Sequence, residues 1–223
     1  MDYAIIVAGG RGLRMGGDVP KQFIPIGGMP VLMRTMMAFD GKKIILVLPA
    51  DQHEYWERLK EDYKFDLPHQ IAEGGETRFH SVQNGLALIP DDEEGVVAVH
   101  DGVRPFVATE VIEKCYATAR SEGTAVPVIP IVETVRQMLP EGDSLTVDRG
   151  LYRLVQTPQT FRISLLKEAY RQPYQTSFTD DASVVEELGH RIALVEGNRE
   201  NIKLTTPPDI SYAEFLIGLK PRA

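Results

Sequence analysis

Apolar, strand-like segments alternate with helix-like segments along most of the 223-residue chain. The predicted strands are residues 3–8, 43–48, 69–72, 96–100, 125–128 and 191–195, and the predicted helices are residues 30–39, 51–63, 77–88, 109–121, 164–170, 180–188 and 208–219. Such alternation is typical of a mainly parallel sheet, because consecutive parallel strands have to be joined by a crossover, which is usually a helix. We therefore predict an α/β fold with a Rossmann-like, doubly wound and mainly parallel sheet.

Residues 131–161 break this alternation. Extended segments there flank the sequence Pro140-Glu141-Gly142-Asp143, a turn that is typical of a hairpin and not of a strand–helix unit. In a monomer, such a hairpin would expose sheet edges and apolar side chains such as Val132, Met138 and Leu145. We therefore expect a single domain, residues 1–223, with a protruding β-arm at about 131–161 that a second copy covers in a homodimer.

The composition excludes some classes of partner. The formal net charge is -8, with 43% hydrophobic and 25% charged residues, so the basic face that nucleic acids and membrane surfaces require is not expected. No apolar run approaches the roughly 20 residues of a membrane span, and the N-terminus lacks the basic start of a secretory signal. We expect a cytoplasmic protein with neither nucleic acid nor a membrane as partner. To bind an anionic substrate, such an acidic protein would need a local basic pocket.

The first predicted strand runs into a glycine-rich loop, Ala8-Gly9-Gly10-Arg11-Gly12-Leu13-Arg14. Glycines there let backbone N–H groups approach a polyphosphate, and Arg14 and the following Lys21 add two cations near the same place. The loop lacks the Gly-Lys-Ser/Thr of a P-loop, and Met15 stands where a dinucleotide fingerprint has its third glycine. A simple tight turn is the alternative, but the two cations favour phosphate binding.

Polar residues also follow two further strands, and the carboxyl ends of parallel strands are where ligands bind in an open sheet. Gly74 and Gly75 would let backbone groups touch the edge of a base, with the Ser81 hydroxyl as a hydrogen-bond partner, unless they form only a turn. Asp101 suits Mg²⁺ or a ribose hydroxyl, since hard cations prefer carboxylate oxygen. A structural ion pair with Arg104 is the alternative, and Arg104 could instead clamp a phosphate.

Other reactive residue types in the sequence favour structural roles. We expect His100 to be a hydrogen-bonded histidine at a strand end and not a general base. Asp180 and Asp181 are interpreted as acidic residues that favour the positive end of a helix dipole. Cys115 is the only cysteine and falls on an apolar helical stripe, so a packed thiol is expected there.

These residues together indicate nucleotidyl transfer. The reaction needs no protein nucleophile if both substrates are held in line, but it needs positive charge at the α-phosphate and a divalent metal across the triphosphate. Arg14 and Lys21 fit the first requirement. Asp101 fits the second as the protein's contact with Mg²⁺, which is held mainly by the triphosphate.

Short motifs follow one another in a fixed order through nearly the whole chain. They are Ala8-Gly9-Gly10-x-Gly12-x-Arg14-Met15, Pro20-Lys21-Gln22, Gly74-Gly75-x-x-Arg78-x-x-Ser81-Val82, His100-Asp101-x-x-Arg104-Pro105, Val147-Asp148-Arg149, Gln156-Thr157-Pro158-Gln159-x-Phe161, Thr179-Asp180-Asp181-Ala182-Ser183 and Asn201-Ile202-Lys203-x-Thr205. With this ordered set, the chain resembles the sugar-nucleotidyltransferase-like superfamily and, within it, the 2-C-methyl-D-erythritol 4-phosphate cytidylyltransferases of non-mevalonate isoprenoid biosynthesis.

The resemblance implies a reaction of CTP with methylerythritol phosphate, in the presence of Mg²⁺, to give the CDP-alcohol and pyrophosphate. It implies that Arg14 and Lys21 are catalytic, and that CTP is bound by Ala8, Gly9, Gly10, Gly12, Gly74, Gly75, Ser81 and Asp101. It further implies that the acceptor is bound by Arg104, Thr134, Arg149, Thr179 and Lys203. The family forms dimers whose arms reach the neighbour's active site.

Two alternatives to this function stay open. Gly9, and Gly102-Val103 after Asp101, look like the related ribitol-5-phosphate cytidylyltransferases, although Val147-Asp148-Arg149 and the motif at 179–183 favour the methylerythritol enzymes. A non-catalytic nucleotide-binding regulator on the same fold is more remote, because it would be expected to lose Arg14 and Lys21.

Overall fold

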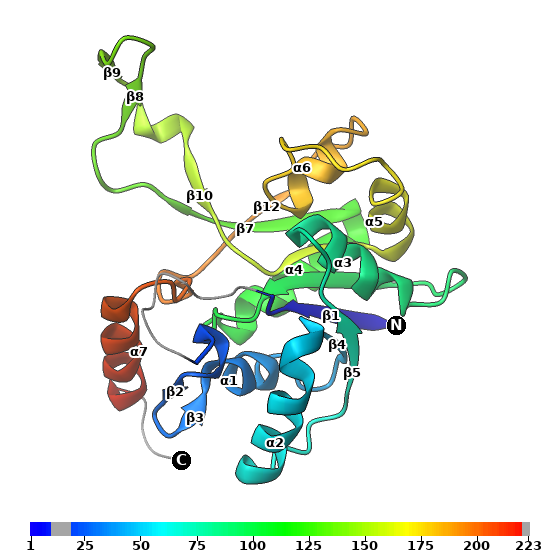
Figure 1. Ribbon diagram of the computed structural model, residues 1–223. Coiled ribbons are helices and arrows are strands. Elements are labelled where there is room, and N and C mark those ends of the chain that lie inside the picture. The colour runs from blue at the N-terminus through cyan, green and yellow to red at the C-terminus, as the bar shows by residue number, and fades with distance from the viewer. Residues whose placement is uncertain (10–18, 220–223) are drawn as a thin grey trace.

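The computed structural model describes residues 1–9 and 19–219. Its main sheet has the strand order β10-β7-β11-β6-β1-β4-β5, and β12 pairs with β7 (Figure 1). The strands are β1 Asp2–Val7, β4 Lys43–Leu48, β5 His69–Glu73, β6 Val96–Asp101, β7 Thr124–Pro130, β10 Arg153–Val155, β11 Gln159–Arg162 and β12 Leu194–Glu196. β1 pairs in parallel with both β4 and β6, and β4 pairs in parallel with β5. The predicted α/β fold with a doubly wound, mainly parallel sheet is confirmed.

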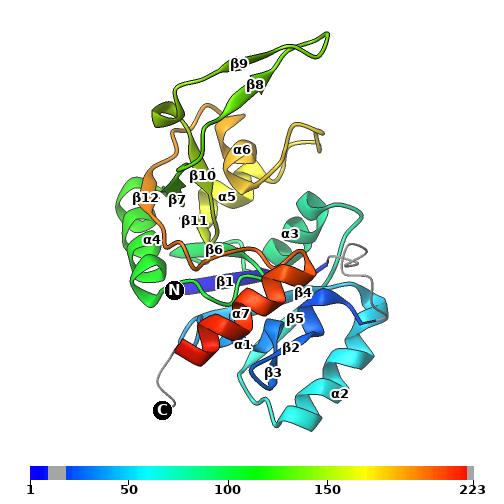
Figure 2. The same cartoon turned by 90° about the vertical axis from the view of Figure 1, so that its left-hand side faces the viewer.

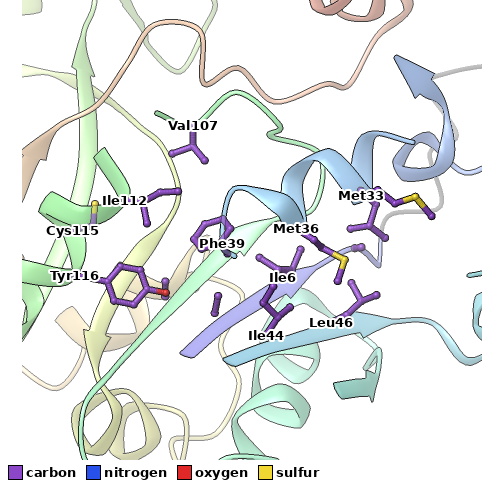
Figure 3. Packing of buried hydrophobic residues seen from close by; sticks show 14 of the residues in the cluster. Ile6, Met33, Met36, Phe39, Ile44, Leu46, Val107, Ile112, Cys115 and Tyr116 are labelled. Carbon is purple, nitrogen blue, oxygen red and sulfur yellow. The ribbon is translucent and has the colours of Figure 1, made fainter. Parts of the chain in front are cut away.

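Helices cover both faces of this sheet. They are α1 Val31–Met37, α2 His53–Tyr63, α3 Arg78–Ala87, α4 Thr109–Glu122, α5 Ile163–Ala169, α6 Asp181–Glu186 and α7 Pro207–Leu219. Because side chains alternate along a strand, Ile6 of β1 packs in the layer of α1, α2 and α4, whereas Ile5 packs in the layer of α3, α5 and α6. Figure 3 shows the first layer, with Met36 of α1 near Ile6 and Tyr116 of α4 further along. Among the described residues, no helix is long and apolar enough to cross a membrane.

α7 packs outside these two layers. It lies beside a small hairpin formed by β2 Pro25–Ile26 and β3 Met29–Pro30 (Figure 2). Ala213 of α7 and Ile26 of β2 belong to a separate buried cluster, which also contains Val103. The carboxylate of Glu214 accepts hydrogen bonds of 2.9 and 3.0 Å from the backbone N–H of Gly27 in the hairpin turn. α7 therefore holds in place the β2–β3 hairpin, which follows Lys21 in the sequence and begins at Pro25.

The predicted arm is present, but it is shorter than expected. β8 Arg136–Met138 and β9 Ser144–Thr146 form an antiparallel hairpin that projects from the body of the molecule (Figures 1 and 2). The predicted range 131–161 was too long, because β10 pairs with β7 and β11 lies between β6 and β7 in the main sheet. Both return strands run antiparallel to β7, so the extended pattern of the sequence could not separate them from the arm. The projecting arm is residues 131–152.

Other elements agree with the sequence except near their ends. The strand predicted at 191–195 is β12, which begins at Leu194, and the helix predicted at 180–188 is α6, which is shorter at both ends. The β2–β3 hairpin was not predicted, since each of its strands has only two residues. Cys115 is fully buried in the layer of α1 and α4, so the predicted packed thiol is confirmed.

Candidate active site

A cleft of about 260 Å³ opens at the carboxyl ends of β1, β5 and β6. Its walls are formed by Val7, Ala8, Gly9, Lys21, Gln22, Gly75, Glu76, Thr77, Arg78, Ser81, Asp101, Val103 and Lys203. This is the end of an open parallel sheet at which ligands bind. The predicted convergence of residues from separate strand ends is confirmed for Ala8, Gly9, Lys21, Gly75, Ser81, Asp101 and Lys203.

Some predicted residues lie elsewhere. Gly10, Gly12 and Arg14 lie outside the described residues. Gly74 stands directly before the cleft wall, where its N–H donates a 2.7 Å hydrogen bond to the Leu48 carbonyl. A Cβ at this position would come within 3.2 Å of the Pro49 backbone, so glycine lets the turn after β5 pack tightly against the end of β4.

Lys21 is positioned by its neighbour Gln22. Lys21 begins the short 3₁₀ helix η2, Lys21–Phe23, and Gln22 is almost completely buried beside it. The Gln22 side-chain amide donates to the Ala8 carbonyl at 2.9 Å and to Oε1 of Gln52 at 2.6 Å. These bonds tie η2 to the end of β1 and so set Lys21 at the cleft. The sequence interpretation did not assign Gln22 to the site, although an amide next to the candidate catalytic lysine was a usable signal.

The turn between β5 and α3 forms a second wall. Ser81 Oγ accepts a hydrogen bond from the Gly75 N–H and donates one to the Thr77 carbonyl, both at 3.0 Å. A Cβ on Gly75 would lie 2.5 Å from the His80 Cβ, so only glycine fits this close approach to the helix. The Ser81 hydroxyl, which we expected to contact a base, is thus already engaged in fixing the shape of the turn.

Asp101, the last residue of β6, lies at the centre of a cluster of cations. Its Oδ2 is 3.1 Å from Arg104 Nε and 3.2 Å from Lys203 Nζ, and its Oδ1 is 3.8 Å from Arg78 Nε. Burial alone would raise the pKa of the Asp101 carboxyl, but Arg78, Lys203 and Arg104 outweigh burial and hold that pKa well below its usual range. The carboxyl group is therefore ionised at neutral pH, and the ion pair that we considered with Arg104 is present.

His100 supports Asp101 from behind. Thr157 Oγ1 lies 2.9 Å from His100 Nδ1 and accepts a hydrogen bond of 3.1 Å from the Asp101 N–H. The other ring nitrogen, Nε2, lies 3.0 Å from the Arg104 carbonyl. Burial lowers the pKa of His100 to about 4 against weaker opposing contacts, so the ring is neutral at pH 7. The prediction of a hydrogen-bonded strand-end histidine is confirmed.

Arg78 reaches from the first turn of α3 to Asp181 at the start of α6. Its Nη1 and Nη2 lie 2.9 and 2.7 Å from the two carboxylate oxygens of Asp181, and the Tyr170 hydroxyl donates to the same carboxylate at 2.6 Å. Asp180 does cap α6, accepting from the Ser183 N–H at 2.9 Å. Asp181 also stands in the first turn of α6, as interpreted, but its carboxylate is in addition fully buried against Arg78, which was not predicted. A single sequence does not show a pair 103 residues apart.

Three predicted acceptor residues are not brought to the cleft within one chain. Thr134 and Arg149 are exposed on the arm, where an Arg149 Nη1 donates to the Val132 carbonyl. Thr179 is exposed in the loop before α6. None of the three is among the residues that line the cleft.

In the part of the chain that the structure describes, the carboxylates that line the cleft are Asp101, which is buried, and Glu76, which is exposed. Among the described residues, no group of three or more His, Cys, Asp or Glu side chains could hold a metal ion by itself. Mg²⁺ is commonly bound by one or two carboxylates together with substrate phosphates. One ionised carboxylate among cations that can bind phosphate fits this mode of binding.

Comparison with known proteins identifies close relatives over nearly the whole chain. A family model described as 2-C-methyl-D-erythritol 4-phosphate cytidylyltransferase matches residues 3–219. A protein of that name from Phocaeicola vulgatus is 61% identical over 219 residues, which are 96% of this chain and 99% of the relative. One from Geobacillus thermodenitrificans is 39% identical, with 98% of each chain covered. The crystal structure of the Thermus thermophilus protein of that name has a TM-score of 0.80 at 33% identity and covers 98% of this chain and 100% of its own.

Proposed function

Because the chain belongs to the 2-C-methyl-D-erythritol 4-phosphate cytidylyltransferase family, we propose that the cleft at the ends of β1, β5 and β6 is its active site. The enzyme transfers CMP from CTP to 2-C-methyl-D-erythritol 4-phosphate and releases pyrophosphate, a step of non-mevalonate isoprenoid biosynthesis. An acceptor phosphate oxygen attacks the α-phosphorus, and the bond from that phosphorus to the bridging oxygen of pyrophosphate breaks. The observation that carries the assignment is that Lys21, Arg78 and Lys203 line the cleft of an acidic protein, with Arg104 paired to Asp101 of the same cleft.

The cytidine base is proposed to lie against the turn between β5 and α3. Cytosine and uracil differ in donors and acceptors at N3 and C4, and a fixed backbone edge discriminates between them by leaving a polar group unpaired when the wrong base is bound. The turn is suitably rigid, since Ser81 bonds to both Gly75 and Thr77. Ala8 and Gly9, which also line the cleft, are proposed to contact the nucleotide, and the family resemblance implies the same role for Gly10 and Gly12.

Lys21 and Arg14 are proposed to be the catalytic residues. Negative charge builds up on the oxygens of the α-phosphate as its phosphorus becomes pentacoordinate, and fixed cations stabilise that state more than the ground state. Lys21 suits this role because it lines the cleft and because the next residue, the buried Gln22, anchors the backbone there. No protein nucleophile is required for a direct in-line transfer.

Mg²⁺ is proposed as the cofactor, held by the triphosphate and by Asp101. When bound, the ion supplies charge neutralisation across the triphosphate. Asp101 suits this contact because its carboxyl group is ionised and reaches the wall of the cleft. Arg104 and Lys203 hold this carboxyl group in place through its Oδ2.

The acceptor is proposed to bind between this cleft and the arm of a second copy. Arg104 and Lys203 would meet the acceptor from the chain that holds CTP, with Thr179 from the loop before α6. Thr134 and Arg149 would come from the partner's arm, so residues 1–223 form one nucleotidyltransferase domain with a dimerisation arm. The exposed apolar surface of the arm supports this proposal. Met138, Leu145 and Leu151 are 68%, 54% and 81% exposed, and such apolar surface is usually covered by a partner.

The alternative functions are not favoured. Gly102, one of the positions that resembled the ribitol-5-phosphate enzymes, is explained by packing: a Cβ there would lie 2.9 Å from the Ala8 Cβ. Glycine at position 102 is therefore explained by the close packing of this backbone against Ala8, and it does not indicate which acceptor is bound. A cytoplasmic location stays a prediction.

The test is pyrophosphate release from the purified chain. The protein is incubated with Mg²⁺, each of the four nucleoside triphosphates, and either methylerythritol phosphate or ribitol 5-phosphate. We expect release only with CTP and methylerythritol phosphate, and loss of release after chelation of the metal. Equal turnover with ribitol 5-phosphate would contradict the acceptor, and equal turnover with UTP would contradict the proposed base recognition.

A further inference from the structure

The buried carboxylate of Asp181 engages one edge of the Arg78 guanidinium. The two terminal nitrogens of Arg78 bond to the two oxygens of Asp181, at 2.9 and 2.7 Å, and the Tyr170 hydroxyl donates to Oδ1 of the same carboxylate at 2.6 Å. The side chain of Asp181 has no exposure to solvent, whereas that of Arg78 is 29% exposed and lines the cleft. The arginine thus stands between a buried carboxylate and the proposed active site.

The two oxygens of Asp101 differ in how they are engaged. Oδ2 lies 3.1 Å from Arg104 Nε and 3.2 Å from Lys203 Nζ, within direct contact distance of both. Oδ1 lies 3.8 Å from Arg78 Nε, which is longer than a hydrogen bond. Arg78 is therefore near enough to attract Asp101 but does not close on it.

We propose that Asp181 is a positioning residue that holds the terminal nitrogens of Arg78 away from Asp101 and so keeps Oδ1 of Asp101 available to the magnesium-bound nucleotide. The inference rests on the proposed function, in which Asp101 meets that nucleotide. Guanidinium groups favour two parallel bonds to one carboxylate. Without the charge of Asp181, the nearest carboxylate for Arg78 is Asp101. Arg78 would then turn its terminal nitrogens onto Oδ1 and compete with the substrate.

Aromatic packing and other hydrogen bonds hold α6 in place, so the Asp181–Arg78 ion pair is not needed merely to attach this helix. Phe79, next to Arg78, stacks on Tyr170 at 4.6 Å and on Phe178 at 5.7 Å between ring centroids. Gln159 also bonds to the start of α6, through Asp180 at 2.8 Å and the Ala182 N–H at 2.8 Å. Without the ion pair, the Gln159 bonds still hold the start of α6 against β11, and the ring contacts hold the segment before α6 against α3. Loss of the Asp181 charge should therefore release Arg78 while α6 stays in place.

The test compares Asp181→Asn with Asp180→Asn, which removes the same charge from the neighbouring residue. Dissociation constants for CTP with Mg²⁺ are measured by calorimetry, and kcat and KM are measured in parallel. We expect Asp181→Asn to weaken CTP binding about tenfold, the loss typical of one charge-assisted contact. Asp180→Asn should stay within about twofold, because asparagine caps a helix as well as aspartate does. An Asp181→Asn enzyme that binds CTP as the wild type does would overturn the proposal.

The same substitution in an Asp101→Asn background distinguishes positioning from a structural role. With the Asp101 carboxylate gone, Arg78 has nothing to capture, so Asp181→Asn should cause no additional loss of CTP binding. A loss that adds in full would show that Asp181 acts on the fold and would overturn the proposal. If Asp181→Asn shows no cooperative thermal transition, Tyr170→Phe takes its place, because it removes the hydroxyl that donates to the same carboxylate. We expect Tyr170→Phe to weaken CTP binding two- to threefold, and to have no such effect in the Asp101→Asn background.

Wild-type protein that releases no pyrophosphate from CTP and methylerythritol phosphate would count against the proposed function itself.

Discussion

The cleft and the arm are built in opposite ways. At the cleft, side chains from distant parts of the chain fix one another: Gln22 bonds to the end of β1, and Arg78 of α3 lies between Asp101 of β6 and Asp181 of α6. On the arm, the polar bonds are local, such as the 2.7 Å bond from Arg136 to Ser144 within the β8–β9 hairpin. Several large apolar side chains of the arm, such as Met138 and Leu151, are exposed to solvent. The geometry of the cleft is thus determined within one chain, whereas the arm lacks, within its own chain, the surface that would bury it.

The largest expected effect is at Lys21, and it concerns the cleft alone. Lys21→Ala should lower kcat by about 10²–10³, the usual loss for one donor that stabilises transition-state charge, with little change in KM for CTP. Steady-state kinetics measure both constants. Lys114→Ala, on the exposed face of α4, provides the control and should behave as the wild type. A raised KM with unchanged kcat would show that Lys21 only binds the ground state.

A second prediction joins the two regions. Arg149→Ala on the arm and Lys21→Ala at the cleft should each be nearly inactive as pure dimers. If the arm serves the partner's cleft, a mixture of the two under subunit exchange should regain about a quarter of the wild-type activity, because half of the dimers are mixed and each holds one intact site. Pyrophosphate release measures the recovery. A mixture that stays inactive after verified exchange would mean that arm and cleft of the same chain work together.

The free energy of unfolding should also depend on pH through His100, which lies beside Asp101 of the cleft. The pKa of His100 is lowered from 6.5 to about 4 in the fold, so the unfolded chain takes up the proton first and stability falls as pH drops from about 6.5 towards 4. We expect a loss of about 2 kcal/mol between about pH 7 and pH 5 from this group, measured by denaturant unfolding. His100→Asn should flatten that part of the profile, whereas His190→Asn, at an exposed position, should not. Equal slopes in wild type and His100→Asn would contradict the assignment.

The smallest effect is expected on the arm. Leu151 is 81% exposed, so Leu151→Ser should change the free energy of unfolding of a monomer by no more than about 0.5 kcal/mol. The same substitution should weaken self-association, measured by sedimentation at decreasing protein concentration. Ala98→Ser in the buried strand β6 should behave in the reverse way, with lower stability and unchanged association. Unchanged association in Leu151→Ser would show that this part of the arm is not in the dimer interface.

The sequence predicted the parts of the molecule that depend on local pattern and on the geometry of parallel sheets. Ala8 ends a predicted strand, Asp101 directly follows one and Gly75 stands in the turn after a third, so the fold itself brings them together. The long-range contacts at the cleft were not predictable, because pairs such as Arg78 with Asp181 lie 103 residues apart and leave no local periodicity. The roles of the acceptor residues came from family resemblance and not from residue pattern.

The arm shows the other limit of sequence interpretation. Residues 153–162 have the same extended character as the hairpin before them, and only the register with β6 and β7 shows that they belong to the sheet. Burial distinguishes only β11 from the arm: Phe161 is fully buried, whereas Leu145 of the hairpin is 54% and Leu154 of β10 is 48% exposed. All three are apolar residues in extended segments, so composition could not separate them.

The place of β11 has a consequence for the order of folding during synthesis. β6 ends at Asp101 and pairs along one edge with β11, whose last residue, Arg162, pairs with Val96. At roughly 5–20 residues per second, the ribosome needs on the order of 3–12 s to add the intervening segment, during which β6 presents an open edge. The nascent half-sheet β5-β4-β1-β6 is therefore exposed to pairing with other chains until the segment that carries the arm has emerged.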